Sequence, residues 1–269
     1  MAAPARPAAG QMSNFECQAG LSNAELGWSS EKKVWCCQNQ NVGCSGEDPT
    51  RASVDATCGA AGKAVLDFRQ IAHNNLAGRG PDPGMPHAIQ YRGVATVDGE
   101  CVMMEVTATD EQAYQPESPD QNGVTMNTQV GKVNLAAGAK SDLKVGFVYC
   151  ETQQPALLSK FNISFYAVNE PTDRKITVRG YTSYTLDNPT LFDKSYTDYG
   201  TTFVARDACE SAVGTDACAL TFNFDGVSGF EVTLEAPNSE ISLGEPFYFG
   251  GSMCQSASLP VAICSATDC

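Results

Sequence analysis

Cysteine is the residue that most constrains how this chain can fold. Twelve cysteines stand beside only two histidines. An even number of cysteines with so little histidine favours disulfides over metal binding, and disulfides persist in oxidising compartments. We therefore expect a secreted or extracellular protein, or one of a secretory-organelle lumen, in which all twelve cysteines form disulfides. They are Cys17, Cys36, Cys37, Cys44, Cys58, Cys101, Cys150, Cys209, Cys218, Cys254, Cys264 and Cys269.

The sequence leaves the pairing of these cysteines open. Neighbours in the chain such as Cys36 and Cys37 do not easily bond to each other, so each is expected to bond to a different segment. Residues 1–10 lack the apolar stretch of a complete secretion signal, so the expected location rests on the cysteines.

The net charge excludes several classes of partner. Acidic residues outnumber basic ones 31 to 17, which gives a formal charge of −14. Such a chain repels nucleic acid and anionic membranes, and calcium is the cation that suits its carboxylates. The alternative is that the charge serves solubility alone. No apolar run is long enough to span a membrane.

The first part of the chain predicts a disordered tail and a small helical module. Residues 1–15 are rich in alanine and proline, and residues 16–80 contain the densest cysteines. Ser29 or Ser30 is a suitable cap for a short helix over the following residues. Apolar residues at three- and four-residue steps predict an amphipathic helix over 51–72, followed by a proline- and glycine-rich linker over 74–84. Those apolar residues are Val54, Cys58, Ala61, Val65, Phe68 and Ile71.

From residue 86 onward the apolar residues follow a period of two. Residues 88–97 and 101–107 flank Asp98-Gly99, a strong hairpin signal. Further strands are expected at 143–150, 161–166, 175–185, 218–225, 230–235 and 246–250. Many short strands without helices between them predict an antiparallel β-sandwich or jelly roll over residues 86–251. Residues 252–269 are expected to form an irregular tail held by cysteines.

One cysteine-rich segment resembles a known motif. Residues 27–37, GWSSEKKVWCC, with Gly43-Cys44, resemble the "GWS…KK.WCC…GC" motif of cysteine-rich secreted proteins of dinoflagellates. The segments 176–180, 187–189 and 247–251 resemble a β-rich module found beside that motif. The resemblance implies secretion and a building block of an assembly such as flagellar hairs, trichocyst rods or cell coverings. It implies no catalytic residue.

The sequence offers little for catalysis. Only His73 and His87 could serve as bases near neutral pH, and both are expected to be structural. No Gly-x-Ser-x-Gly or His-Glu-x-x-His motif occurs in the sequence, and the cysteine spacing is not that of a zinc site. A glycosidase or other hydrolase is the least supported function, because the sequence cannot place a pair of carboxylates at the required separation.

Residues 180–199 form the best candidate binding site, with four tyrosines and three aspartates in twenty residues. Aromatic faces can stack on sugars, carboxylates can hold calcium, and tyrosine-rich loops also suit protein interfaces. The alternative is a sandwich loop packed on itself. The candidate ligand or interface residues are Tyr181, Tyr184, Asp187, Asn188, Asp193, Tyr196, Asp198 and Tyr199.

Asn162-Ile163-Ser164 is an N-glycosylation sequon. The period-two pattern places Asn162 on the solvent face of its strand.

Together these features predict a non-enzymatic, disulfide-linked structural subunit of a secreted or extracellular assembly. Its expected partners are other copies of itself or related secreted proteins, and no cofactor is expected apart from calcium. The alternative is a lectin-like module that binds glycans or calcium through residues 180–199.

Overall fold

The chain forms two compact units, residues 1–49 and 50–269. The computed structural model describes residues 15–19, 32, 36, 58, 62–125, 128–166, 173–186, 192–197, 200–206, 219–238 and 246–255. In the first unit, Cys17 and Cys36 form a disulfide, and Lys32 Nζ donates to the Ala19 carbonyl at 2.8 Å. Residues 1–14 of the predicted tail 1–15 and most of the predicted cysteine module lie outside the described residues.

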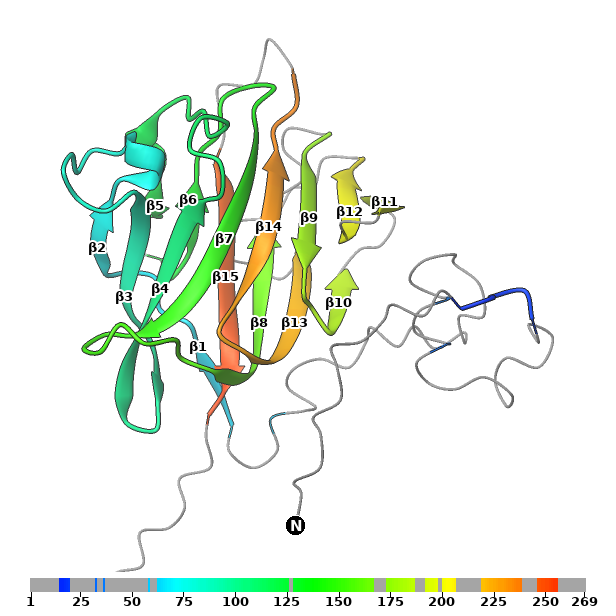
Figure 1. Ribbon diagram of the computed structural model, residues 1–269, viewed down its shortest axis with the longest axis horizontal. Coiled ribbons are helices and arrows are strands. Elements are labelled where there is room, and N and C mark those ends of the chain that lie inside the picture. Colours follow the sequence, from blue (N-terminus) through cyan, green and yellow to red (C-terminus); the bar gives the residue numbers. More distant parts are fainter. Residues whose placement is uncertain are drawn as a thin grey trace, which may run out of the picture. The chain divides into compact units, whose positions relative to one another are not determined.

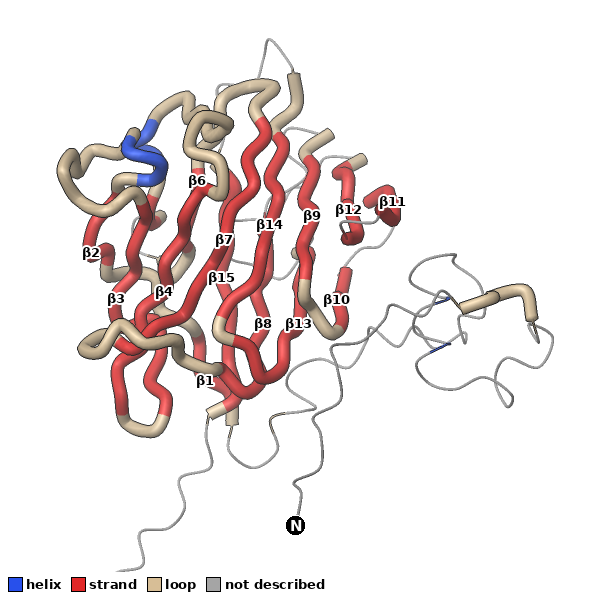
Figure 2. The backbone as a smooth tube through the Cα atoms, in the orientation of Figure 1, coloured by secondary structure: helices blue, strands red, loops and turns tan. Residues whose placement is uncertain are grey.

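The second unit is an antiparallel β-sandwich, which confirms the predicted fold class. Its two sheets lie one behind the other, and helix in the described residues of this unit is limited to short turns (Figures 1 and 2). Sheet A has the order β10-β13-β8-β15-β6-β5, with β1 also paired to β15. Its strands are β1 (Lys63–Val65), β5 (Gly123–Val124), β6 (Gly131–Val133), β8 (Leu158–Tyr166), β10 (Ser183–Leu186), β13 (Leu220–Val227) and β15 (Phe247–Cys254).

Sheet B has the order β11-β12-β9-β14-β7-β4-β3-β2 and is the nearer layer in Figure 1. Its strands are β2 (Ile71–Asn74), β3 (Ala88–Val97), β4 (Glu100–Ala108), β7 (Lys140–Tyr149), β9 (Lys175–Arg179), β11 (Phe192–Thr197), β12 (Gly200–Ala205) and β14 (Gly229–Glu235). Two 3₁₀ turns, η4 (Leu76–Gly78) and η5 (Pro119–Gln121), lie in the loops.

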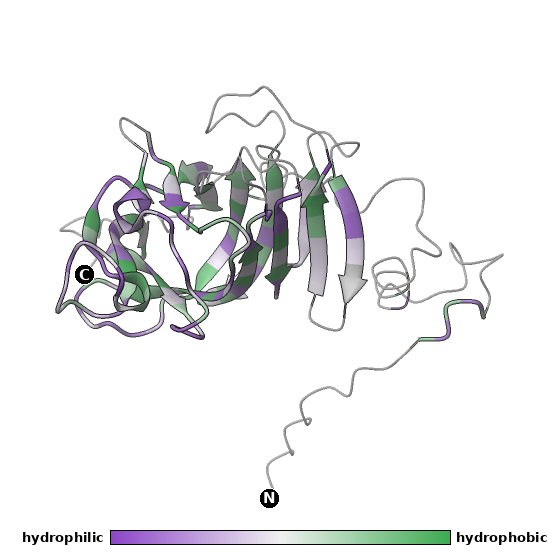
Figure 3. Cartoon of the chain, turned by 90° about the horizontal axis from the view of Figure 1, so that it is seen from above, coloured by the Kyte–Doolittle hydropathy of each residue, from purple (hydrophilic) through white to green (hydrophobic). Residues whose placement is uncertain are grey.

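Alternation along the strands builds the core between the sheets. Hydrophobic and hydrophilic residues form alternating bands along the strands in Figure 3. Phe161 of β8 stacks on Phe224 of β13 with ring centroids 4.8 Å apart, and Phe224 stacks on Phe230 of β14 at 4.7 Å. The last contact joins the two sheets. Each buried phenylalanine contributes about 2–3 kcal/mol through removal of apolar surface from water.

The β3–β4 hairpin is confirmed at the predicted turn. Asp98 and Gly99 have φ values of 52° and 84°. A two-residue turn with positive φ at both positions matches the right-handed twist of the flanking strands, and aspartate followed by glycine tolerates it.

The predicted amphipathic helix is wrong for the described residues 62–72. These residues form β1, the connection that follows it and the start of β2. Leu66 and Phe68 are fully buried two residues apart, whereas Val65, which the helix would bury, is 58% exposed. The Leu66 N–H donates to the Gly251 carbonyl and the Asp67 N–H to the Val94 carbonyl, both at 2.9 Å. Pairing with both sheets therefore overrides the helical spacing, and the structure does not support a helical module.

Two further predicted boundaries differ from the structure. The expected strand 175–185 is two strands, β9 in sheet B and β10 in sheet A. The expected irregular tail starts inside β15, which runs to Cys254, and residues 256–269 lie outside the described residues.

Two disulfides hold the sandwich. Cys58 bonds to Cys254, and Cys101 at the start of β4 bonds to Cys150 just after β7. Three disulfides in the described residues fit an extracellular or secreted protein. The remaining predicted disulfide cysteines lie outside the described residues: Cys37, Cys44, Cys209, Cys218, Cys264 and Cys269.

Candidate interaction face

The predicted binding segment 180–199 is not one loop. β10 and β11, which it contains, belong to opposite sheets. Tyr184 is 7% exposed, and its ring lies 4.8 Å from that of Phe203. The Tyr181 ring lies 5.2 Å from Phe222, and its hydroxyl is 2.7 Å from Thr201 Oγ1. Both tyrosines therefore contribute to the packing of the sandwich.

The charged residues of this segment pair with side chains of the same unit. Asp193 accepts from Arg206 Nε at 3.1 Å. Lys194 Nζ donates to the Tyr184 hydroxyl at 3.2 Å and lies 5.4 Å from its ring centroid, a cation–π distance. Asp187, Asn188, Asp198, Tyr199 and the Tyr196 side chain lie outside the described residues.

Asn162 is buried, whereas the sequence predicts that it lies on a solvent-exposed face of its strand. It is 8% exposed in the middle of sheet A, between β13 and β15. Its Oδ1 accepts from the Ser252 N–H at 2.9 Å and from Ser252 Oγ at 3.0 Å. Alternation correctly places it on the face away from the core, but neighbouring strands on both sides cover it.

The outer face of sheet A carries a patch of short, uncharged residues, which we call the neutral patch. Strand register places them in two rows across four neighbouring strands. The spacing of strands makes each row roughly 15 Å long. One row contains Ser183, Asn223, Asn162 and Ser252, and the other contains Thr185, Thr221, Ser164 and Gly250.

Hydrogen bonds join neighbours within the neutral patch. Asn223 Nδ2 donates to Ser183 Oγ at 3.0 Å, and Ser164 Oγ is 2.7 Å from Thr221 Oγ1. Ser183, Thr185 and Thr221 are partly exposed. The next row along the strands brings Tyr166 opposite Tyr248, both half-buried. The lack of charge and the tyrosines at the margin are features that the neutral patch shares with the centres of protein interfaces.

Charged residues lie around the neutral patch. Lys160 and Asp225 are opposite each other beyond one row, and Lys132 is opposite Tyr248. Burial lowers the pKa of Lys132, whose Nζ donates to Gln121 Oε1 at 3.3 Å. The neutral patch thus has a polar rim.

The outer face of sheet B is charged. Arg179 pairs with Glu231 at 2.9 Å and Lys175 pairs with Glu235, in each case between β9 and β14. Thr233 donates to Asp142 across the β14–β7 pair. Oppositely charged residues that face each other across strands stabilise a solvated sheet face modestly.

The two histidines, both among the described residues, lie in different surroundings. His73 is 4% exposed on β2, and His87 Nδ1 lies 2.7 Å from Glu111 Oε1. Hydrogen bonds from Arg69 lower the pKa of Asp67 to about 2. Burial raises the pKa of Tyr114 to about 12 and that of Tyr91 further. Tyr91 donates to the Gly123 carbonyl at 2.8 Å, so it secures the start of β5.

The core holds one small apolar cavity worth noting. It measures about 20 Å³ and lies between the sheets. Side chains such as Val145, Ile163 and Phe249 line it, and no polar atom is available there to bind water or an ionic ligand. Across the described ranges, no three histidine, cysteine, aspartate or glutamate side chains gather as metal ligands.

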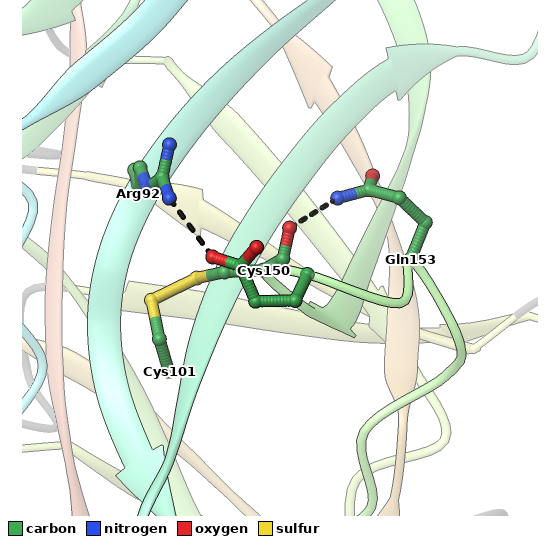
Figure 4. Close-up of a disulfide and its surroundings, with 5 residues drawn as sticks. Arg92, Cys101, Cys150 and Gln153 are labelled. Atoms are coloured by element: carbon green, nitrogen blue, oxygen red, sulfur yellow. Dashed lines mark hydrogen bonds and ion pairs between the residues drawn. A yellow bond between two sulfur atoms is a disulfide. The ribbon is translucent and has the colours of Figure 1, made fainter.

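The Cys101–Cys150 disulfide joins neighbouring strands at one end of sheet B (Figure 4). The Cys150 N–H donates to the Cys101 carbonyl at 2.8 Å, and Gln153 Nε2 donates to the Cys150 carbonyl at the same distance. Arg92 pairs with Glu151 at 3.2 Å. The disulfide therefore links the turn end of the β3–β4 hairpin to the end of β7.

Comparisons with known proteins identify no family. No family model and no curated protein matches the chain. One solved structure whose backbone partly matches this chain is the N-terminal domain of the Streptococcus gordonii adhesin Sgo0707, with a TM-score of 0.43 and 10% identity. The match covers 71% of this chain and 58% of that chain, so this chain spans less than two thirds of the neighbour's length. No helix in the described part of the chain is long and apolar enough to cross a membrane.

Proposed function

We propose that this protein is a non-enzymatic, disulfide-linked structural subunit of a secreted or extracellular assembly. The neutral patch is the observation that carries the proposal. In a chain with a formal charge of −14, copies repel one another wherever acidic surfaces approach. A face of hydroxyl, amide and glycine residues lets a second copy or a related secreted protein approach without that repulsion.

Association of the purified full-length chain tests this proposal. Sedimentation velocity and negative-stain electron microscopy are performed under oxidising conditions, with and without calcium. We expect assembly that grows with protein concentration. A monomer at every concentration, with and without calcium, would overturn the proposal.

A pair of lysine variants locates the contact. Thr185→Lys places a charge at a partly exposed position of the neutral patch, and Ser195→Lys places the same charge at an exposed position on the outer face of sheet B. We expect Thr185→Lys to weaken association and Ser195→Lys to leave it unchanged. Equal effects would exclude the neutral patch as the contact.

A lectin-like module that binds glycans or calcium through residues 180–199 is the alternative. It has less support, because the rings of Tyr181 and Tyr184 pack against aromatic residues of the sandwich. Loss of glycan binding on Asp193→Asn, with the fold intact, would favour this alternative.

A further inference from the structure

The Cys58–Cys254 disulfide encloses the whole sandwich in a covalent loop. The two cysteines are 196 residues apart in sequence, and their Cα atoms are 5.0 Å apart. Every strand in the described residues, from Lys63 in β1 to Cys254 in β15, lies between them. The sulfur–sulfur bond therefore connects the two points at which the chain enters and leaves the fold.

These two points lie on neighbouring strands. β1 pairs antiparallel with β15, with Lys63 opposite Cys254 and Val65 opposite Ser252. The Gln255 N–H donates to the Gly62 carbonyl at 3.1 Å, just beyond the strand pair. Residues before β1 and residues after β15 consequently depart from the same end of the sandwich.

This arrangement makes the sandwich weak against tension in the absence of the disulfide. A force that separates residue 62 from residue 255 would break the β1–β15 pair from its end, one hydrogen bond after another. Each such bond contributes only about 1 kcal/mol net. β1 is three residues long, so few bonds resist before the core residues Leu66 and Phe68 are pulled out.

We infer that the Cys58–Cys254 disulfide protects the sandwich from unfolding under tension, and we call it a load clamp. Tension applied between residues 1–57 and residues 255–269 passes through the covalent bond, which lies beside the first pair that would separate. The sandwich then carries none of that tension and keeps its surfaces intact. This goes beyond the proposed function, because a monomer would possess the clamp equally and an assembly could form without it.

The other disulfide of the sandwich provides a matched control. Cys101–Cys150 closes a loop of 49 residues inside the sandwich and does not connect the two loaded points to each other. Its removal leaves the path of the tension unchanged.

Single-molecule force spectroscopy tests the clamp on the full oxidised chain. Handles attached at Thr57 and Ser256 load Cys58 and Cys254 directly. We expect no unfolding step from the oxidised wild type or from Cys101→Ser/Cys150→Ser. A reductant added at constant force should then release a step of several hundred ångström, at most roughly 700 Å for a fully extended loop of this length.

Cys58→Ser/Cys254→Ser should unfold under the same load without reductant, in a step shortened by the loop that Cys101–Cys150 retains. If that variant does not fold, reduction of the folded wild type gives the answer alone. A step of several hundred ångström from the oxidised wild type would overturn the inference, as would reduction that releases no length. Association in solution is measured separately, so either idea can fail without the other.

Discussion

The two outer faces of the sandwich differ in how they satisfy their polar groups. On sheet B, charged side chains such as Arg179 and Glu231 pair across strands, and their charged groups stay in contact with solvent. On sheet A, short uncharged side chains such as Ser164 and Thr221 bond directly to each other. The same alternation of apolar and polar residues generates both faces. A polar outer face is therefore not necessarily exposed to solvent, because the length of a side chain determines how far its polar group extends from the sheet.

A buried charge gives the largest expected contrast between the faces. Ser164 is 6% exposed on sheet A, whereas Ser195 is exposed on sheet B. We expect Ser164→Lys to lower the free energy of unfolding by about 2–4 kcal/mol, because it forces an ammonium group among buried neighbours. Ser195→Lys should change it by less than about 0.5 kcal/mol. Urea denaturation with the disulfides intact measures both, and equal losses would remove the distinction between the faces.

Removal of one hydrogen-bonding side chain gives a smaller contrast. Asn162→Ala leaves the Ser252 N–H and hydroxyl without their acceptor, so we expect a loss of about 1–3 kcal/mol. Glu231→Ala breaks an exposed ion pair and should cost less than about 1 kcal/mol.

Mass spectrometry of the protein secreted from a eukaryotic host should find Asn162 without a glycan. A glycan at full occupancy would show that the side chain is accessible.

The smallest expected effect is a difference in salt dependence between the hydroxyl pair of sheet A and the ion pair of sheet B. Double-mutant cycles on Ser164–Thr221 and on Arg179–Glu231 should each give a coupling energy of roughly 0.2–1 kcal/mol. The charged pair should weaken between low salt and about 1 M salt, because the screening length falls to roughly 3 Å. The hydroxyl pair should not change. A salt-dependent hydroxyl coupling would contradict the contact described for sheet A.

The sequence predicts the elements that depend on local pattern. The alternation of Phe161, Ile163 and Phe165 and the Asp98-Gly99 turn are sufficient for a strand and a hairpin, and both occur. The predicted 51–72 helix is wrong for its described residues, because the Leu66 and Asp67 N–H groups donate to strands that are distant in sequence, a tertiary effect that no local spacing reports.

The candidate site was harder to predict than the fold. A cluster of tyrosines between 180 and 199 indicates a binding loop only if the chain stays on one side of the sandwich. Here it passes from sheet A to sheet B, so Tyr184 turns inward against Phe203. The neutral patch left a weaker trace: alternate positions such as 162 and 164, 221 and 223, and 250 and 252 carry no charge. Only the strand order brings those three strands together.

The position of β15 imposes an order on biosynthesis. The last strand of the sandwich lies inside sheet A, with β8 on one side and β6 and β1 on the other. Sheet A therefore stays in three separate parts, β10-β13-β8, β6-β5 and β1, until residues 247–254 have been synthesised, with part of the core exposed. Cys101 and Cys150 can join while synthesis continues, whereas Cys58 waits as a free thiol for Cys254. A host that produces this protein must protect that thiol from wrong partners until Cys254 has been synthesised.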